Sequence, residues 1–259
     1  MNRRRAITMG LSALTLCRCS RLAWSAANKG CRGAVSGSEL SEYRQLMQPT
    51  SDLGPLSANF DNQVLGHVKA LRNRYGLRPG VSFYDDREQA NALAMLELLR
   101  PDGEWGGPDG TILLGRHLLF RLWRDGAASI FRRSQTSPSR VLQENDLDIL
   151  VITAHEFGHI LQYKSGMAPD GPWQMEPHAD FLAGWAIDRA WLSDLFSDKD
   201  ESFNNAIRLI FSLGDAAFNS PDHHGTPELR AAMVRAGQES RHFDVRTAFK
   251  RGMELAGLR

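Results

Sequence analysis

The segment "VITAHEFGHILQY", residues 151–163, decides how this chain folds and what chemistry it carries. It holds two histidines, His155 and His159, four positions apart, and a glutamate, Glu156, directly after the first. Side chains four apart lie on one face of an α-helix, so both imidazoles can reach a single cation. The apolar residues on either side of this group are typical of a buried central helix. The spacing therefore predicts a buried helix that holds a metal ion.

The residue types favour zinc. Neutral imidazole is a good zinc ligand, and three protein ligands with an open fourth position are typical of a catalytic zinc. Glu156 would project toward a bound water, where it can act as a general base. Gly158 leaves one side of the helix bare, so another element can pack close to the metal. The pattern predicts Zn²⁺ as the cofactor, His155 and His159 as ligands and Glu156 as a catalytic residue.

A third ligand must come from elsewhere in the chain. A metzincin would have a glycine at position 162 and a histidine at position 165, but these residues are Gln162 and Ser165, which excludes that version. Downstream, Glu176 and Asp180 are four apart. On a helix, Glu176 could bind zinc while Asp180 accepts the free ring N–H of a ligand histidine, a bond that fixes the tautomer of the ligand.

Pro177 complicates this assignment. A proline disfavours helical geometry in the residue before it, so we expect Glu176 to sit at the start of a helix. The register of Glu176 with Asp180 is then less firmly set. His178 and Asp180 are therefore alternative third ligands.

Two motifs resemble those of a known class of enzyme. "HEFGH" (155–159) with "EPHADFLAG" (176–184) resembles the gluzincin metallopeptidases, which have H-E-x-x-H and a later E-x-x-A-D motif. The similar families are the HtpX-like and CAAX-prenyl-protease-type peptidases and the neutral zinc metallopeptidases. The resemblance spans about residues 80–240. It implies a zinc-dependent peptidase fold in which Glu176 completes the metal site.

A later segment, "HGTPELRAAMVRAG" (224–237), is similar to a helix that begins near a histidine in those families. The resemblance implies that His224 stabilises the oxyanion formed when a peptide carbonyl is attacked. Arg230 would either order the site through a buried ion pair or lie on the surface. The other histidines are interpreted as structural or exposed: His67, His117, His178 (unless it is a ligand) and His242.

"NALA…GTILLGRHLL" is more loosely similar to the strand region before the zinc helix of these families, where substrate adds to an edge strand. Residues 91–99 suit either a helix or a strand, and the resemblance favours strands over 93–99 and 111–115. Two features depart from the families. Only 16 residues separate His159 from Glu176, and the membrane-spanning helices of the embedded relatives are absent.

The fold class predicted from the whole sequence is mainly α, within α+β: a zincin-like helical domain with a small sheet in the first half. The periodicity and the capping residues locate the elements. A strand is expected over 81–86, and helices are expected over 58–75, 116–126, from 145 or 146 to 166, 177–193, 201–219, 226–238 and 244–257.

The charges of the chain argue against nucleic acid as a partner. The first 27 residues carry five arginines and no acid, and removing those five from 31 basic residues leaves 26 against 30 acidic residues. A mildly acidic body without a basic stripe is not typical of a nucleic-acid binder. A peptide or protein substrate is expected instead.

The N-terminal segment resembles a twin-arginine export signal. "MNRRRAITMGLSALTL" joins a basic start to an apolar run that is too short to span a bilayer, and "AWSAA" offers small residues for cleavage. We expect a signal over 1–27, a linker over 28–37 and a single zincin-like domain over 38–259. The protein would be periplasmic or secreted, with no stable membrane span after signal removal. A disordered basic tail on a cytosolic protein is the alternative, and bulky Leu16 argues against a lipid anchor on Cys17.

The sequence thus predicts an exported zinc-dependent metallopeptidase that hydrolyses peptide bonds with a zinc-bound water activated by Glu156. Two alternatives keep the metal site. One is a catalytically silent zinc protein with a binding or structural role, and the other is a zinc amidase acting on a non-peptide amide. The sequence leaves the substrate and the oligomeric state open.

Overall fold

The computed structural model describes residues 47–48, 57–86, 91–120, 122, 146–168, 173–187, 207 and 226–258. The described chain is mainly helical with a small sheet in its first half, so the predicted fold class is confirmed. The signal and linker expected over 1–37, and all of the helix expected over 201–219 except helical Ile207, lie outside these residues. None of the described helices has the length and apolar character needed to cross a membrane.

The sheet has four strands in the order β1-β2-β4-β3, with bounds Met47–Gln48, Gly80–Tyr84, Thr111–Gly115 and Ala92–Met95 respectively. β2 and β4 are parallel, while β1 and β3 run antiparallel to their neighbours, so β3 is an edge strand of this sheet. The strand predicted over 111–115 is confirmed.

The strand predicted over 93–99 is wrong in its extent, because β3 ends at Met95. Met95 pairs with Thr111, the first residue of β4, so the pairing of the two strands ends there. The chain turns there instead. The Thr111 hydroxyl donates to the carbonyl of Glu97 at 2.7 Å and accepts from the amide of Leu99 at 2.9 Å.

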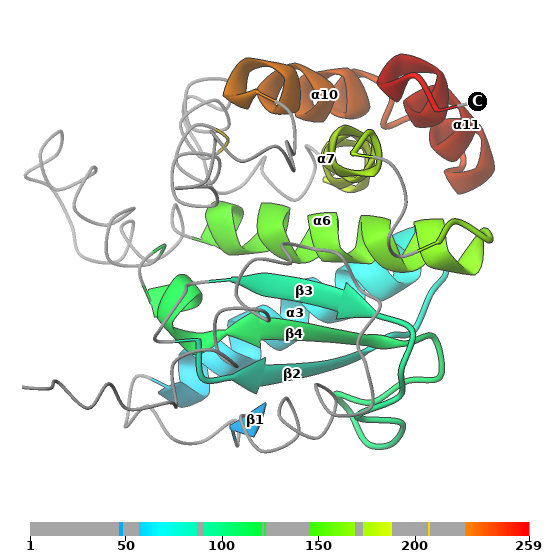
Figure 1. Ribbon diagram of the computed structural model, residues 1–259. Coiled ribbons are helices and arrows are strands. Elements are labelled where there is room, and N and C mark those ends of the chain that lie inside the picture. The colour runs from blue at the N-terminus through cyan, green and yellow to red at the C-terminus, as the bar shows by residue number, and fades with distance from the viewer. Residues whose placement is uncertain are drawn as a thin grey trace, which may run out of the picture.

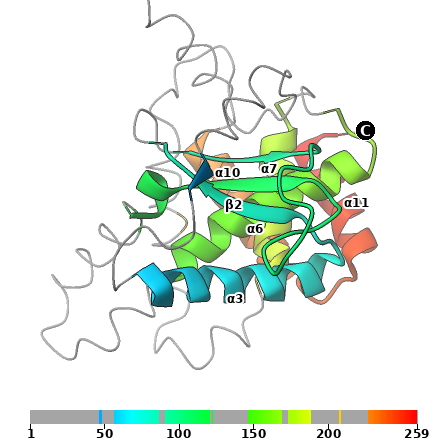
Figure 2. The ribbon, with the colours of Figure 1, turned by 90° about the horizontal axis from the view of Figure 1, so that it is seen from below.

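One face of the sheet packs against two long helices, α3 (Ser57–Tyr75) and α6 (Asp146–Lys164), both close to their predicted bounds. Alternate residues of a strand point to one face, and one such set shares a core with both helices. In Figure 1, α3 lies behind the sheet and α6 runs beside edge strand β3; Figure 2 shows the same arrangement from below. The shared residues of the sheet are Val81, Phe83, Ala92, Ala94, Ile112 and Leu114.

Three further helices form a layer on the far side of α6: α7 (Met175–Ala186), α10 (Pro227–Glu239) and α11 (Val245–Ala256) (Figure 1). α7 lies between α6 and the other two. A Cβ on Gly184 would meet the carbonyl oxygen of Val234 at 1.9 Å, so α7 and α10 cross with almost no side chain between them. This close crossing places the start of α10 beside the buried face of α7.

The predicted bounds of α7 were too late at both ends. The helix begins at Met175 rather than 177, because Pro177 occupies the first turn, where its missing N–H removes no helical hydrogen bond. It ends at Ala186, since Ile187 has extended backbone (φ −79°, ψ 108°). The expected continuation to 193 is therefore wrong at its first step. α10 and α11 agree with prediction, and the Thr226 and Asp244 side chains cap them.

The helix expected over 116–126 begins as predicted. Residues 116–120 are helical directly after β4, and the expected end at Gly126 lies outside the described residues. The buried carboxylate of Asp86 accepts from the amides of His117 and Leu118 at 2.6 and 3.0 Å, so a residue from the end of β2 caps this helix.

Candidate metal centre

The two histidines of the H-E-x-x-H pattern face each other on α6. His155 and His159 are both buried, and their ring planes are nearly perpendicular with centroids 4.6 Å apart. Their Nε2 atoms lie 3.0 Å apart. The one-turn spacing of an α-helix produces this arrangement directly, because residues four apart overlie each other.

The third member of the group is Glu176, in the first turn of α7. Its Oε2 lies 3.4 Å from Nε2 of His155, and its Oε1 lies 3.6 Å from Nε2 of His159. Among the described residues, these three side chains form a buried group that could hold a metal ion. Ligand atoms about 2.0–2.2 Å from a tetrahedral zinc lie roughly 3.3–3.6 Å apart. The two carboxylate–imidazole separations match this spacing, while the two Nε2 atoms, 3.0 Å apart, are a few tenths of an ångström closer than it.

The close packing of α6 against α7 makes this meeting possible. A Cβ on Gly158 would lie 3.1 Å from Cα and 3.2 Å from the carbonyl oxygen of Ala179. Any larger side chain at position 158 would push α7, and Glu176 with it, away from the histidines. The bare face expected at Gly158 is thus in contact with α7.

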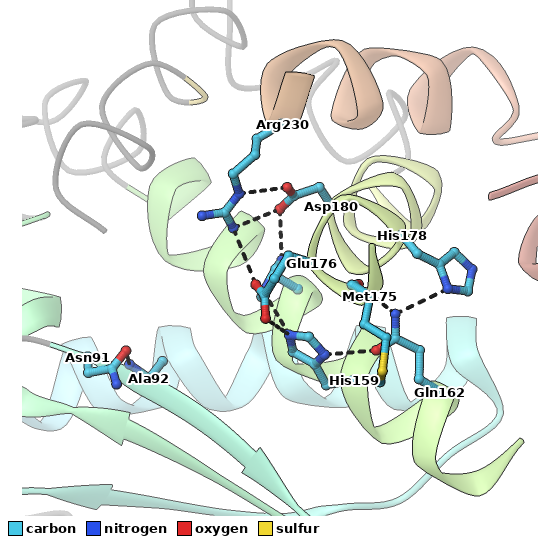
Figure 3. Close-up of polar contacts among 10 residues, drawn as sticks. Asn91, Ala92, His159, Gln162, Met175, Glu176, His178, Asp180 and Arg230 are labelled. Atoms are coloured by element: carbon cyan, nitrogen blue, oxygen red, sulfur yellow. Dashed lines mark hydrogen bonds and ion pairs between the residues drawn. The ribbon is translucent and has the colours of Figure 1, made fainter. Parts of the chain in front are cut away.

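Asp180 fixes the proton position of His155. Its Oδ1 lies 2.8 Å from Nδ1 of His155, the hydrogen bond expected from the sequence. A carboxylate only accepts, so Nδ1 carries the proton and Nε2 presents its lone pair to Glu176 and His159. Arg230 donates to both oxygens of Asp180, at 2.8 and 3.1 Å (Figure 3). Of the two alternatives for Arg230, the buried ion pair is the one observed.

The electrostatics of Asp180 suit this role. Burial by itself raises the pKa of its carboxyl, but the charge of Arg230 and the contacts with His155 outweigh it and hold the pKa below the usual range. Asp180 therefore remains an anion that accepts from His155. Arg230 also lies 3.9 Å from Glu176, so one guanidinium faces two carboxylates.

The two alternative third ligands point elsewhere. Asp180 is occupied by His155 and Arg230, and the ring nitrogens of His178 contact the Gln162 amide and the carbonyl oxygen of Phe249. Burial lowers the pKa of His178 to about 4, so this imidazole is neutral near pH 7. The structure brings Glu176, rather than His178 or Asp180, to the two Nε2 atoms.

The donor set fits a cation. The Nε2 atoms of both histidines and one carboxylate converge in a buried setting. Such a group gains most from a bound metal ion, because burying carboxylate charge without compensation is costly.

The two predicted catalytic residues are Glu156 and His224, and only Glu156 lies within the described residues. Glu156 is buried on α6 next to His155, 2% exposed. His224 lies outside the described residues, so its assignment stays a prediction.

Sequence reasoning did not identify the role of Gln162. Its Oε1 accepts from Nδ1 of His159 at 2.8 Å, as Asp180 does from His155. The spacing of the two residues in the sequence indicates this contact, because Gln162 stands three residues after His159 and so lies beside it on the helix.

Comparisons of the chain with protein-family models, with curated proteins and with solved structures found no match.

Proposed function

We propose that the protein is a zinc-dependent metallopeptidase of the gluzincin type. The observation that carries the proposal is the convergence of Nε2 of His155, Nε2 of His159 and the Glu176 carboxylate, with Glu156 beside the first ligand on the same helix. Imidazole and carboxylate ligands in this number are typical of catalytic zinc sites. The E-x-x-A-D resemblance points to the same class.

His155, His159 and Glu176 would hold the ion. When bound, zinc lowers the pKa of a coordinated water and polarises a carbonyl oxygen. Glu156 then has the task of a general base: its carboxylate accepts a proton from the attacking water and delivers it to the leaving nitrogen. Asp180 and Arg230 keep His155 in the tautomer that binds the metal. His224 is proposed to donate a hydrogen bond to the oxyanion.

The proposed substrate is a peptide or an unfolded protein segment that adds to edge strand β3. An edge strand has backbone donors and acceptors that an extended peptide can pair with. β3 lies beside α6, the helix that carries both histidines (Figure 1). Export of the chain through its N-terminal arginine-rich segment remains part of the proposal.

The test uses purified protein and elemental analysis. We expect about one zinc per wild-type chain and Glu156→Gln, and a large loss in Glu176→Ala. His242→Gln, which removes an exposed histidine, should keep its zinc and serves as the matched control. Peptide hydrolysis should be present in wild type and His242→Gln and lost in Glu156→Gln.

Each failure points to a different alternative. An unchanged rate in Glu156→Gln would contradict the mechanism. Zinc retained without turnover of any peptide, but with turnover of a non-peptide amide, would favour an amidase. Zinc retained with no turnover of either would favour a metal-stabilised binding protein. No zinc in the wild type would end the proposal.

A further inference from the structure

A chain of hydrogen bonds connects the C-terminal helix α11 to the metal centre. The imidazole of His178 bridges the carbonyl oxygen of Phe249, 3.1 Å from Nε2, and the amide nitrogen of Gln162, 3.1 Å from Nδ1. Nε2 of Gln162 also donates to the carbonyl of Met175 at 2.7 Å, and its Oε1 faces Nδ1 of His159 (Figure 3). Three helices contribute to this chain: α11, α7 and α6.

The direction of each of these bonds is fixed by groups that can only accept. Phe249 presents a backbone carbonyl, so Nε2 of His178 must carry the proton and its Nδ1 must accept. Gln162 then uses its two N–H groups on His178 and on the Met175 carbonyl. Its oxygen is left to face His159, whose proton is thereby placed on Nδ1.

The residues that form this series of hydrogen bonds are buried, which strengthens the preference for one direction of each bond. Gln162 and His178 are 0% exposed and His159 is 1% exposed, so little solvent competes with their hydrogen bonds. α11 holds the His178 ring by contact as well. A Cβ on Gly252 would lie 2.6 Å from Cδ2 of His178, and the Phe249 ring lies edge-on to the imidazole, with centroids 4.7 Å apart.

The two ligand histidines are thus oriented in different ways. His155 is held by the carboxylate of Asp180, which Arg230 pairs. His159 is held by the neutral side-chain amide of Gln162. Contacts with residues of α7, one of which bonds to α11, orient that amide. Truncating Gln162 or His178 changes no charge of the metal centre, which separates their role from that of Asp180.

We propose that Gln162 and His178 are positioning residues for the metal centre. They place the proton of His159 on Nδ1 and direct its Nε2 lone pair toward Glu176. Zinc affinity then depends on how α11 packs against His178. This inference rests on the metal-binding part of the proposed function and is independent of hydrolysis. Partners of this kind typically change metal affinity by about 10–100-fold.

The first readout needs neither metal nor activity. Proton–nitrogen correlation spectra of apo protein with ¹⁵N-labelled histidine report which ring nitrogen of each histidine carries the proton. We expect His159 protonated on Nδ1 and His178 on Nε2 in the wild type. Gln162→Leu should release His159 from a single tautomer.

Gln162→Glu separates the effect of these hydrogen bonds on the tautomers from the effect of side-chain packing. A carboxylate still accepts from His159, so the His159 tautomer should be kept. It cannot donate to His178, so His178 should move its proton to Nδ1 and lose its bond to Phe249. Phe181→Leu, a buried change on α7 beside Gly252, is the matched control and should lower stability while leaving both tautomers unchanged.

The second readout is zinc affinity, measured by competition with a chelator. We expect a loss of about 10–100-fold in Gln162→Leu, a smaller loss in His178→Phe, and little change in Phe181→Leu. Unchanged His159 tautomer and unchanged affinity in Gln162→Leu would overturn the inference. Wild type that binds zinc with this pattern but hydrolyses nothing would contradict only the peptidase proposal. Wild type that binds no zinc would overturn this inference together with the proposed function.

Discussion

Two buried ionic clusters in this protein differ in how their charges are matched. Beside the sheet, Arg116 donates to both oxygens of Asp61 at 2.7 and 3.2 Å, and its guanidinium lies over the Phe83 ring, 3.6 Å from the centroid. The guanidinium and the carboxylate form a bidentate pair. Such a bidentate pair is typical of a structural ion pair, and here it joins α3 to the residues that follow β4.

The metal centre has the opposite character. The single guanidinium of Arg230 faces two carboxylates, Asp180 and Glu176, and two imidazole lone pairs point at the second of them. Both clusters are buried and both join segments about 50 residues apart. Burial of charge alone therefore does not distinguish a group that could hold a metal ion from a structural ion pair; a surplus of converging acceptors does.

The largest expected effect is the loss of zinc in Glu176→Ala. Zinc binding to structural sites is worth about 10–16 kcal/mol over its full ligand set, so removing one ligand should weaken affinity by roughly 10³-fold. Chelator competition measures it. Asp61→Asn breaks the other cluster and should leave zinc affinity unchanged; an equal loss in both variants would erase the distinction between the clusters.

The next effect falls on the structural pair. Arg116→Met leaves Asp61 as a buried, uncompensated charge, so we expect the free energy of unfolding to fall by about 3 kcal/mol. Urea denaturation of the apo protein measures it. The double variant Asp61→Leu with Arg116→Met should recover most of that loss, because no charge is then left unpaired. No recovery would mean that the arginine stabilises the fold by packing on Phe83 rather than by pairing.

A smaller effect is expected for Asp180→Asn. The amide oxygen can still accept from Nδ1 of His155, but the charge that stabilises this bond and pairs Arg230 is gone. We expect zinc affinity to fall by about 10-fold, at the low end of the range for partners of metal ligands. A loss as large as that of Glu176→Ala would indicate that Asp180 itself binds the metal.

The smallest effect concerns a histidine outside both clusters. Burial lowers the pKa of His67, on α3, from 6.5 to about 4. The folded state then binds fewer protons than the unfolded state, so its stability is full above pH 6.5 and falls as the pH drops toward 4. His67→Leu should flatten this slope in metal-free protein, by on the order of 1 kcal/mol near pH 6. If stability falls equally with pH in wild type and His67→Leu, burial of His67 does not cause the loss.

Local patterns predicted most of the described elements. The bounds of α3, α6, α10 and α11 follow from periodicity and caps, both of which act within a turn or two of helix. The errors arose where a distant partner decides. β3 ends at Met95 because β4 begins opposite it, and nothing in residues 93–99 carries that information.

The same division applies to the metal centre. The sequence by itself determined that His155 and His159 share a helix face, since the 3.6-residue turn fixes their relation regardless of the rest of the fold. The spacing of four between Glu176 and Asp180 indicated that the two could be neighbours on the next helix, but Pro177 left that register open until the structure placed both on α7. Only the tertiary structure decided which carboxylate meets the two Nε2 atoms, because that depends on how closely Gly158 lets α7 approach α6. The orientation of His159 by Gln162 and His178 was decided in the same way, since it needs a carbonyl from α11, seventy-one residues beyond His178.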